Sequence, residues 1–306
     1  MKRDVISMLD VKDDLFEILD LAAEIKRKQK AGEIYEPLKN KTLGMIFEKP
    51  STRTRISFEV GMTQLGGHAI YLSPKDMQMG RGETVADTAR VLSRYVDAIM
   101  YRAFSHDIML ELAKNATVPV INGLDDVEHP TQILADLLTI REHKGDFKGL
   151  KFVYVGDGNN VANSLALGAA MVGMDFYIAC PEGYEPNAYI WQKAREIAAE
   201  NGSKMEILRN PVEAVKDADV IYTDVAVSMG QEAEAEVRER IFRAYQVNEE
   251  LVSHAKDDYI FMHCLPAHRG HEVTDGVVDS PNSVVFDEAE NRLHAQKGLL
   301  VKLLGE

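Results

Sequence analysis

Cysteine is scarce in this sequence of 306 residues, which contains only Cys180 and Cys264. Two thiols exclude a disulfide framework and indicate a reducing compartment, so we expect a cytoplasmic protein. Long hydrophobic runs are also missing, because no stretch of 18 apolar residues occurs, and no membrane-spanning helix is expected. The first residues, MKRDVISMLDVKDD, are too acidic and too poor in apolar side chains to predict a signal peptide.

Basic residues are in deficit relative to acidic ones. The chain has 35 Lys and Arg against 49 Asp and Glu, which gives a net charge of −14. Binding to nucleic acid or to an anionic membrane requires a positive face, so we expect neither as a partner. An acidic protein that binds a phosphorylated ligand has to gather its arginines locally.

Short apolar runs alternate with helical stretches along a chain that is long enough for two domains. The runs predict strands at 42–47, 69–72, 97–101, 119–122, 151–155, 175–180, 205–208, 220–223, 259–263 and 283–286. Their alternation with helices predicts an α/β fold with two domains, each with a parallel sheet flanked by helices. The polar stretch 141–150 is the expected boundary. Helices are expected first at 11–30 and last at about 287–304, and the last could pack on either domain.

The segment EKPSTRTR at 48–55 follows the first predicted strand and opens a helix. Ligands of parallel α/β sheets bind outside the carboxyl ends of strands, where a helix N-terminus offers N–H groups and a positive dipole end to an anion. Three hydroxyls add donors, and Arg53 or Arg55 adds a bidentate fork. A capped, solvated turn would explain an isolated Ser-Thr-Arg, but this density of donors at a strand end favours a phosphate site.

Two further loops bring polar groups to the same predicted edge. His129 and Gln132 lie at the start of a helix, whose first turn suits Pro130. Arg102 follows the end of another predicted strand. Each feature alone fits a helix cap or a strand terminus. Together with 48–55 they predict one site for a small phosphorylated substrate.

A glycine-containing turn, VGDGNNV at 155–161, lies between a predicted strand and a helix in the second half. It invites a dinucleotide interpretation, but Val161 replaces the third glycine of the G-x-G-x-x-G pattern. In addition, Cys180 and Pro181 stand where an acidic residue should end the next strand. We therefore expect no nicotinamide cofactor, and the turn with Asn160 is available to another ligand.

Two other strand ends in the second half carry polar side chains. Asp224 follows one strand, and the stretch HCLPAHRG at 263–270 ends another. A metal site is an alternative interpretation, with the ligands His263, Cys264, His268 and His271. Adjacent His and Cys residues cannot easily both ligate zinc, so we expect no metal.

These motifs closely resemble those of the ornithine carbamoyltransferases. The resemblance rests on STRTR at 51–55, FE at 58–59, GRGE at 80–83, Arg102, HPTQ at 129–132, SMG at 228–230 and HCLP at 263–266. It extends from about residue 1 to the C-terminus. STRTR and HPxQ are shared by all transcarbamoylases, whereas SMG and HCLP resemble the ornithine branch. The HPLPR motif and the lysine-bearing loop of the aspartate branch are missing.

The resemblance implies a reaction of carbamoyl phosphate with L-ornithine to give L-citrulline and phosphate, within arginine metabolism and without metal or cofactor. It implies a carbamoyl phosphate-binding domain at 1–140, to which a C-terminal helix at 288–306 returns. It also implies an ornithine-binding domain at 141–287. The resemblance further implies a homotrimer with sites between subunits.

Individual roles are implied position by position. The residues that would bind carbamoyl phosphate are Ser51, Thr52, Arg53, Thr54, Gln78 of a neighbouring subunit, Arg102, His129, Gln132, Cys264, Leu265 and Arg292. The residues that would bind ornithine are Asn160, Asp224, Ser228 and Met229. The catalytic residues would be Arg102, His129, Gln132, Asp224 and Cys264. Because Leu265 and Pro266 flank it, Cys264 is expected to be a weakly polar neighbour of the attacking amine.

One position departs from the family pattern, because Ala226 stands where the family usually has tryptophan. The change bears on the packing of the ornithine loop and on the choice of amine. A carbamoyltransferase for a diamine such as putrescine is therefore an alternative, although a carboxylate-binding loop at 228–229 favours an amino acid. A nicotinamide-dependent oxidoreductase would rest on the turn at 156–161 alone. The intact site residues disfavour a non-catalytic protein of this fold.

Overall fold

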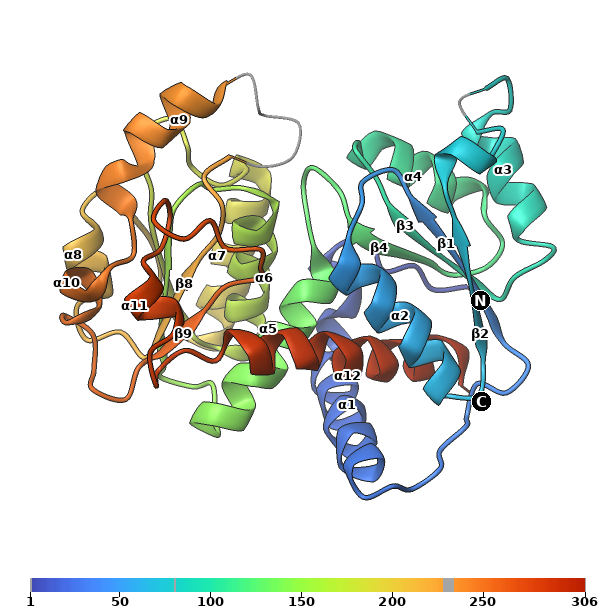
Figure 1. Cartoon of the computed structure of the whole chain (residues 1–306), viewed down its shortest axis with the longest axis horizontal. Coiled ribbons are helices and arrows are strands. Elements are labelled where there is room, and N and C mark those ends of the chain that lie inside the picture. The colour runs from blue at the N-terminus through green and yellow to red at the C-terminus, as the bar shows by residue number, and fades with distance from the viewer. Residues whose placement is uncertain (1, 80, 228–233, 306) are drawn as a thin grey trace. The chain divides into compact units, whose positions relative to one another are not determined.

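The computed structural model describes residues 2–79, 81–227 and 234–305. The chain forms two compact units, one of residues up to Leu138 and from Glu290 onward, the other of Thr139–Ala289. Each unit contains one sheet of parallel strands with helices on both faces, so the predicted α/β fold is confirmed (Figure 1). None of the helices in this described part is both long and apolar enough to cross a membrane.

The first unit contains a four-stranded sheet in the order β2-β1-β3-β4. Its strands are β1 (Thr42–Phe47), β2 (His68–Leu72), β3 (Ala98–Arg102) and β4 (Val120–Leu124). Its helices are η1 (Met8–Asp14), α1 (Leu15–Lys30), α2 (Thr52–Gln64), η2 (Pro74–Asp76), α3 (Val85–Leu92), α4 (His106–Asn115) and the first part of α5 (Pro130–Lys144). It also contains most of α12 (Val285–Leu304).

Helices from the N-terminal part of the chain and from its C-terminal end both pack in this unit, and they bury the apolar strand residues of the sheet. Ile46, Ile99 and Tyr101 pack on one face against side chains of α4 such as Met109. The C-terminal helix α12 packs against α1, where a side chain in place of Gly298 would lie 2.7 Å from the carbonyl oxygen of Ile18. The C-terminal helix thus returns to the first unit, as the resemblance implied.

The second unit contains a five-stranded sheet in the order β7-β6-β5-β8-β9. Its strands are β5 (Lys151–Val155), β6 (Asp175–Ala179), β7 (Met205–Leu208), β8 (Val220–Thr223) and β9 (Ile260–Met262). Its helices are α6 (Asn160–Val172), α7 (Ala188–Asn201), α8 (Pro211–Val215), α9 (Ala235–Phe242), η4 (Arg243–Tyr245), α10 (Glu249–Val252) and α11 (Asp275–Val278). The strand order reverses between β5 and β8, which is where doubly wound sheets bind their ligands.

Two layers of helices cover this second sheet (Figure 1). On one side lie α8, α10 and α11, which bury Val153, Ile221 and Phe261. On the other side lie α6 and α7, where Trp191 packs against Phe176 with ring centroids 6.4 Å apart. All side chains of α6 from Val161 to Val172 are buried, so this helix fixes the turn that precedes it.

Two sequence predictions need correction. The helix expected at 11–30 is a 3-10 helix up to Asp14 and becomes an α-helix at Leu15. The strand expected at 283–286 is wrong, because Ser283 forms only an isolated bridge with Phe261 and α12 begins at Val285. An apolar run of four residues cannot distinguish a strand from the start of a buried helix by its pattern alone.

Candidate active site

The segment 51–55 lies at the carboxyl end of β1, where the sequence predicted an anion site. Ser51 caps α2, and its Oγ accepts a hydrogen bond from the amide of Thr54 at 3.3 Å. Thr52 is exposed, and Ser51 and Arg53 are half-buried. The first-turn amides of a helix have no carbonyl partner within the helix, and its dipole is positive at this end. This helix start can therefore bind an anion.

Thr54 points inward, toward a buried arginine from the C-terminal helix. The Nη2 of Arg292 donates to Thr54 Oγ1 at 3.1 Å, and its Nη1 donates to Gln132 Oε1 at 2.5 Å. The amide nitrogen of Gln132 in turn donates to Asp136 Oδ1 at 2.8 Å. Arg292 is only 2% exposed. It therefore links the N-terminal ends of α2 and α5, which carry the predicted phosphate-binding and carbamoyl-binding residues.

His129 is buried directly before α5. Its pKa is well below the usual value of 6.5, first because burial disfavours the charged ring and then because Arg292, Arg102 and Arg53 are all positive. The imidazole is therefore neutral at pH 7 and keeps one N–H. The three arginines that lower this pKa lie near the imidazole, and the hypothesis of a phosphate site requires such a local cluster of positive charge.

Arg102 ends β3 and is 5% exposed, and its Nη1 donates to the carbonyl oxygen of Gly123 at 3.5 Å. Lys49 is also buried, with its ammonium 4.7 Å from the centroid of the Phe104 ring. Burial, and then the charge of Arg102, lower the pKa of Lys49. Lys49 was not among the site residues predicted from the sequence, although it lies within the same motif. Its charge adds to the positive potential of this edge.

A buried carboxylate shapes the turn that leads to His129, and sequence reasoning missed it. Asp125 Oδ1 accepts from the amides of Val127 and Glu128 at 2.8 and 2.7 Å. Its Oδ2 accepts from Asn122 Nδ2 at 2.9 Å and lies 2.7 Å from His106 Nδ1. The available signal was an aspartate one residue after the end of β4, a position at which side chains commonly fold back onto backbone amides.

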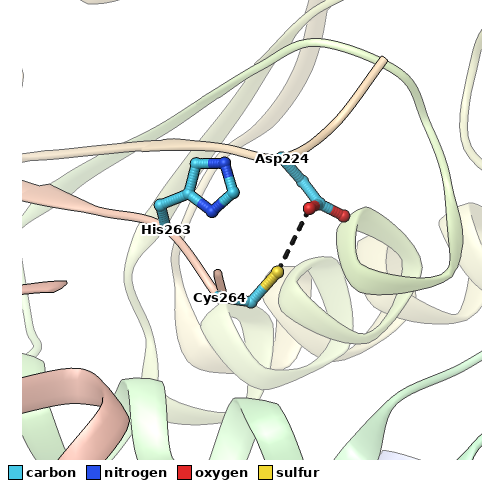
Figure 2. Close-up of side chains that lie close together, drawn as sticks. All are labelled: Asp224, His263 and Cys264. Carbon is cyan, nitrogen blue, oxygen red and sulfur yellow. Dashed lines mark hydrogen bonds between the residues drawn. The ribbon is translucent and has the colours of Figure 1, made fainter. Parts of the chain in front are cut away.

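The second unit brings Asp224 and Cys264 together at the carboxyl ends of β8 and β9, as Figure 2 shows. Cys264 Sγ donates to Asp224 Oδ1 at 3.1 Å. Asp224 Oδ2 accepts from Asn159 Nδ2 at 2.8 Å. A carboxylate therefore accepts the thiol's hydrogen bond, and the role of Cys264 as a weakly polar neighbour of the attacking amine stays a prediction.

His263 completes a cluster whose ligand atoms could hold a metal ion (Figure 2). Single ligand atoms of His263, Cys264 and Asp224 lie within 4.8 Å of one another. However, His263 Nδ1 accepts from the amide of Leu265 at 2.9 Å, so the ring proton is on Nε2, which faces Glu272 Oε1 at 3.2 Å. Both ring nitrogens already have protein partners, and a metal would have to displace one of them. We therefore propose no metal here.

The remaining predicted residues have varied surroundings. Asn160 is the first residue of α6 and is half-buried, but its neighbour Asn159 makes the contact with Asp224. Leu265 is partly buried, and Gln78 is exposed. Ser228 and Met229 lie outside the described residues.

A cavity of about 500 Å³ opens at the point where the strand order of the second sheet reverses. Gly156, Thr223 and Asp224, from the ends of β5 and β8, form part of its lining. Ala226 and side chains of α9 line it as well. Asp224 thus faces a space large enough for a small organic molecule.

The fold and the two sites define a class of enzyme. Residues 3–142 match the family model of the aspartate/ornithine carbamoyltransferase carbamoyl-P binding domain, and residues 148–303 match that of the Asp/Orn binding domain. The chain therefore belongs to the aspartate/ornithine carbamoyltransferase family.

Within this family the chain is similar to proteins named for ornithine. It is 61% identical over 303 residues, 99% of both chains, to "Ornithine carbamoyltransferase, catabolic" of Thermoplasma volcanium. It is 61% identical over 304 residues to "Ornithine carbamoyltransferase, anabolic" of Pyrococcus furiosus, covering 99% of this chain and 96% of the relative. A solved structure of ornithine carbamoyltransferase from Pyrococcus furiosus superimposes with a TM-score of 0.96, covering 99% of this chain and 97% of that one.

Proposed function

We propose that this chain transfers the carbamoyl group of carbamoyl phosphate to the side-chain amine of L-ornithine, which yields L-citrulline and phosphate. The gathering of Arg53, Arg102 and Arg292 around the neutral, buried His129 is the observation that carries the proposal. It lies in the part of the chain that matches a carbamoyl-P binding domain. Relatives named for ornithine, at 61% identity over 99% of the chain, support ornithine as the acceptor.

In the proposed reaction the neutral amine attacks the carbonyl carbon and a tetrahedral intermediate forms. The C–O bond to phosphate then breaks, and the amine's proton leaves with the phosphate. Arg102 and His129 donate to the carbonyl oxygen, whose negative charge grows in the transition state, as in an oxyanion hole. Because His129 is neutral, it donates its N–H without adding another positive charge next to the arginines.

The leaving phosphate is bound by the start of α2. Ser51 and Thr52 each contribute a hydroxyl, and Arg53 contributes its guanidinium. Backbone amides at the helix start add further donors to the phosphate. Thr54 and Gln132 each accept a hydrogen bond from Arg292 in addition to their proposed contacts with the substrate. In this proposal Arg292 orients these two residues, and Gln132 offers its second amide hydrogen to the carbamoyl group.

The acceptor occupies the second unit, with Asn160, Asp224, Ser228 and Met229 on its α-amino and α-carboxylate groups. Cys264 and Leu265 line the path of the side-chain amine and the carbamoyl amide. A free amine of this kind has a pKa near roughly 10.4, so only about one molecule in 2,500 is neutral at pH 7. Burial of the amine favours the neutral form that attacks. The rate at subsaturating ornithine therefore rises with pH from 6 to 8.

We further infer a cytoplasmic homotrimer in which Gln78 reaches the site of a neighbouring subunit. Gln78 is exposed on its own chain. The outer strand β2 has exposed apolar side chains, Ile70 and Tyr71, at the edge of its sheet, and such edges favour association with another chain. Both cysteines are free thiols, in keeping with a reducing compartment.

A citrulline assay with carbamoyl phosphate and a panel of amines tests the proposed function. We expect turnover with L-ornithine and none with aspartate, and preference for putrescine would favour the diamine alternative. Arg53→Ala should lower kcat/KM by about two to three orders of magnitude, because a charge-assisted contact to the phosphate is lost. The control is Arg27→Ala on α1, which removes an exposed ion pair with Glu33 beyond the end of that helix. Equal activity of the two variants would refute the phosphate assignment.

A further inference from the structure

A buried arginine on α9 plays no part in the reaction described above. Arg238 is 6% exposed, although its neighbours Val237 and Glu239 on the same helix face solvent. A guanidinium removed from water has to be compensated by charge and hydrogen-bond partners, because burial of an unpaired charge is strongly unfavourable. The partners of Arg238 therefore indicate what this side chain holds together.

Besides an exposed partner four residues earlier, Glu234, whose Oε2 accepts from its Nε at 3.3 Å, Arg238 contacts two separate segments of the second unit. Its Nη1 donates to Asp157 Oδ2 at 2.9 Å and to the carbonyl oxygen of Ala226 at 3.1 Å. The guanidinium lies 5.0 Å from the centroid of the Tyr184 ring and 6.0 Å from that of Phe242. The Asp157–Arg238 ion pair is nearly excluded from water, with both side chains 8% exposed. Its geometry is therefore held by packing as well as by charge.

The two segments that Arg238 joins are those that carry the proposed ornithine-binding residues. Asp157 lies in the turn between β5 and α6, which leads to Asn159 and Asn160. Ala226 lies two residues beyond Asp224. A second link between the segments is the hydrogen bond from Asn159 to Asp224. The ion pair and this hydrogen bond together set the distance between the β5–α6 turn and the loop after β8.

We propose that Arg238 is a positioning residue for the amino-acid substrate: its bonds to Asp157 and Ala226 fix the spacing of the two segments that bind the α-amino and α-carboxylate groups. This inference rests on the proposed function. Arg238 lies in the second unit, and its partners Asp157, Ala226 and Glu234 belong to that unit as well. Loss of its side chain should therefore weaken binding of ornithine and leave binding of carbamoyl phosphate unchanged.

Steady-state kinetics of Arg238→Ala test the proposal. We expect the KM for ornithine to rise roughly tenfold or more, since a small displacement of binding groups has effects of this size. The KM for carbamoyl phosphate should stay within about twofold of the wild-type value. Arg238→Lys should recover only part of the loss, because an ammonium lacks the planar guanidinium that lies near the Tyr184 and Phe242 rings. Arg195→Met, which changes an exposed arginine on α7, is the control.

Chemical rescue separates positioning from a general loss of structure. Guanidinium chloride, at concentrations that leave the wild-type enzyme unaffected, should lower the ornithine KM of Arg238→Ala by occupying the vacated site between Asp157 and the aromatic rings. An unchanged ornithine KM in Arg238→Ala would overturn the proposal. An equal rise in both KM values without rescue would overturn it too, by indicating only a damaged fold.

Asp157→Asn keeps the inference testable if Arg238→Ala does not fold. Burial raises the pKa of Asp157 to about 6, Arg238 opposes this, and Asp224 and Glu234 add to it. At pH 7.5 the variant should have the higher ornithine KM, and the two enzymes should converge as the pH falls through about 6 and the wild-type carboxylate is protonated. A wild-type KM in Asp157→Asn at pH 7.5 would refute the positioning role. Wild-type enzyme that forms no citrulline at all would instead refute the proposed function.

Discussion

The sulfur of Cys264 lies 3.1 Å from a carboxylate oxygen of Asp224, and the thiol is the donor. The other oxygen of Asp224 accepts from Asn159, so the carboxylate is held from both sides. A hydrogen bond to a charged acceptor stabilises by more than a neutral one, about 1.5–3 kcal/mol. The thiol therefore orients Asp224 in the lining of its cavity, in addition to any contact with the substrate.

Replacement of Cys264 by serine should retain more activity than replacement by alanine. A serine hydroxyl can donate to Asp224 as the thiol does, whereas alanine leaves that oxygen without this donor. We expect kcat/KM for ornithine to be roughly tenfold higher in Cys264→Ser than in Cys264→Ala. Cys180→Ala is the control, since Cys180 is buried at the end of β6 and outside the site. Equal kcat/KM values for the serine and alanine variants would show that the hydrogen bond from residue 264 to Asp224 does not contribute to catalysis.

At the scale of elements, the turn between β4 and α5 depends on the carboxylate of Asp125. This side chain is fully buried and contacts backbone amides of its own turn, Asn122 of β4 and His106 at the start of α4. The turn ends at His129, so the packing of three elements determines where the imidazole lies.

The pair of His106 and Asp125 should make the stability of the first unit depend on pH. The hydrogen bond to Asp125 is the largest cause of the raised pKa of His106. Because the pKa is higher in the folded state than the unfolded value near about 6.5, the stabilisation is complete below about 6.5 and is lost as the pH rises through the raised pKa. His106→Asn keeps a donor without the charge. The Tm of this variant should lie furthest below that of the wild type near pH 6, and the difference should shrink toward pH 9. Each kcal/mol of lost stability should lower the Tm by about 2–4 °C.

Calorimetry of the wild type and of His106→Asn from pH 6 to 9 measures the difference in Tm. The control is His68→Asn, which changes an exposed histidine on β2 of the same unit. A deficit for His106→Asn that stays constant with pH would show that the charge of His106 does not contribute.

At the scale of the whole molecule, the two units divide the proposed chemistry between them. The first has the arginine-rich anion site and the second has the cavity beside Asp224. The proposed trimer adds Gln78 of a neighbouring chain to the first of these sites. An active enzyme would then need residues from two chains.

Mixing two inactive variants tests this arrangement. Arg102→Ala and Gln78→Ala should each have little activity as pure trimers. After random subunit exchange at equal amounts, about a quarter of the sites should combine an intact Arg102 with an intact Gln78 from the neighbour, so citrulline formation should reappear. Native mass spectrometry of tagged chains confirms the exchange. Proven exchange without recovered activity would contradict a shared site.

Local features of this protein follow from the sequence because they depend on residues that are near one another in the chain. The apolar run of β1 and the cap at Ser51 predict a strand followed by a helix N-terminus, and the structure has both. The start of α12 was missed because its short apolar run at 283–286 is compatible with either element.

Contacts across the chain were decided only by the tertiary structure. Asp157 and Arg238 are 81 residues apart, and Asp224 and Cys264 are 40 apart. Whether these side chains come into contact depends on which strands are neighbours in the sheet and on how α9 packs. Neither can be predicted from a local repeat of apolar residues in the sequence. The sequence by itself determined the strand ends, the arginines and the turn residues of the site. The sheet order and the packing determined which of these side chains touch, because both depend on burial summed over the whole unit.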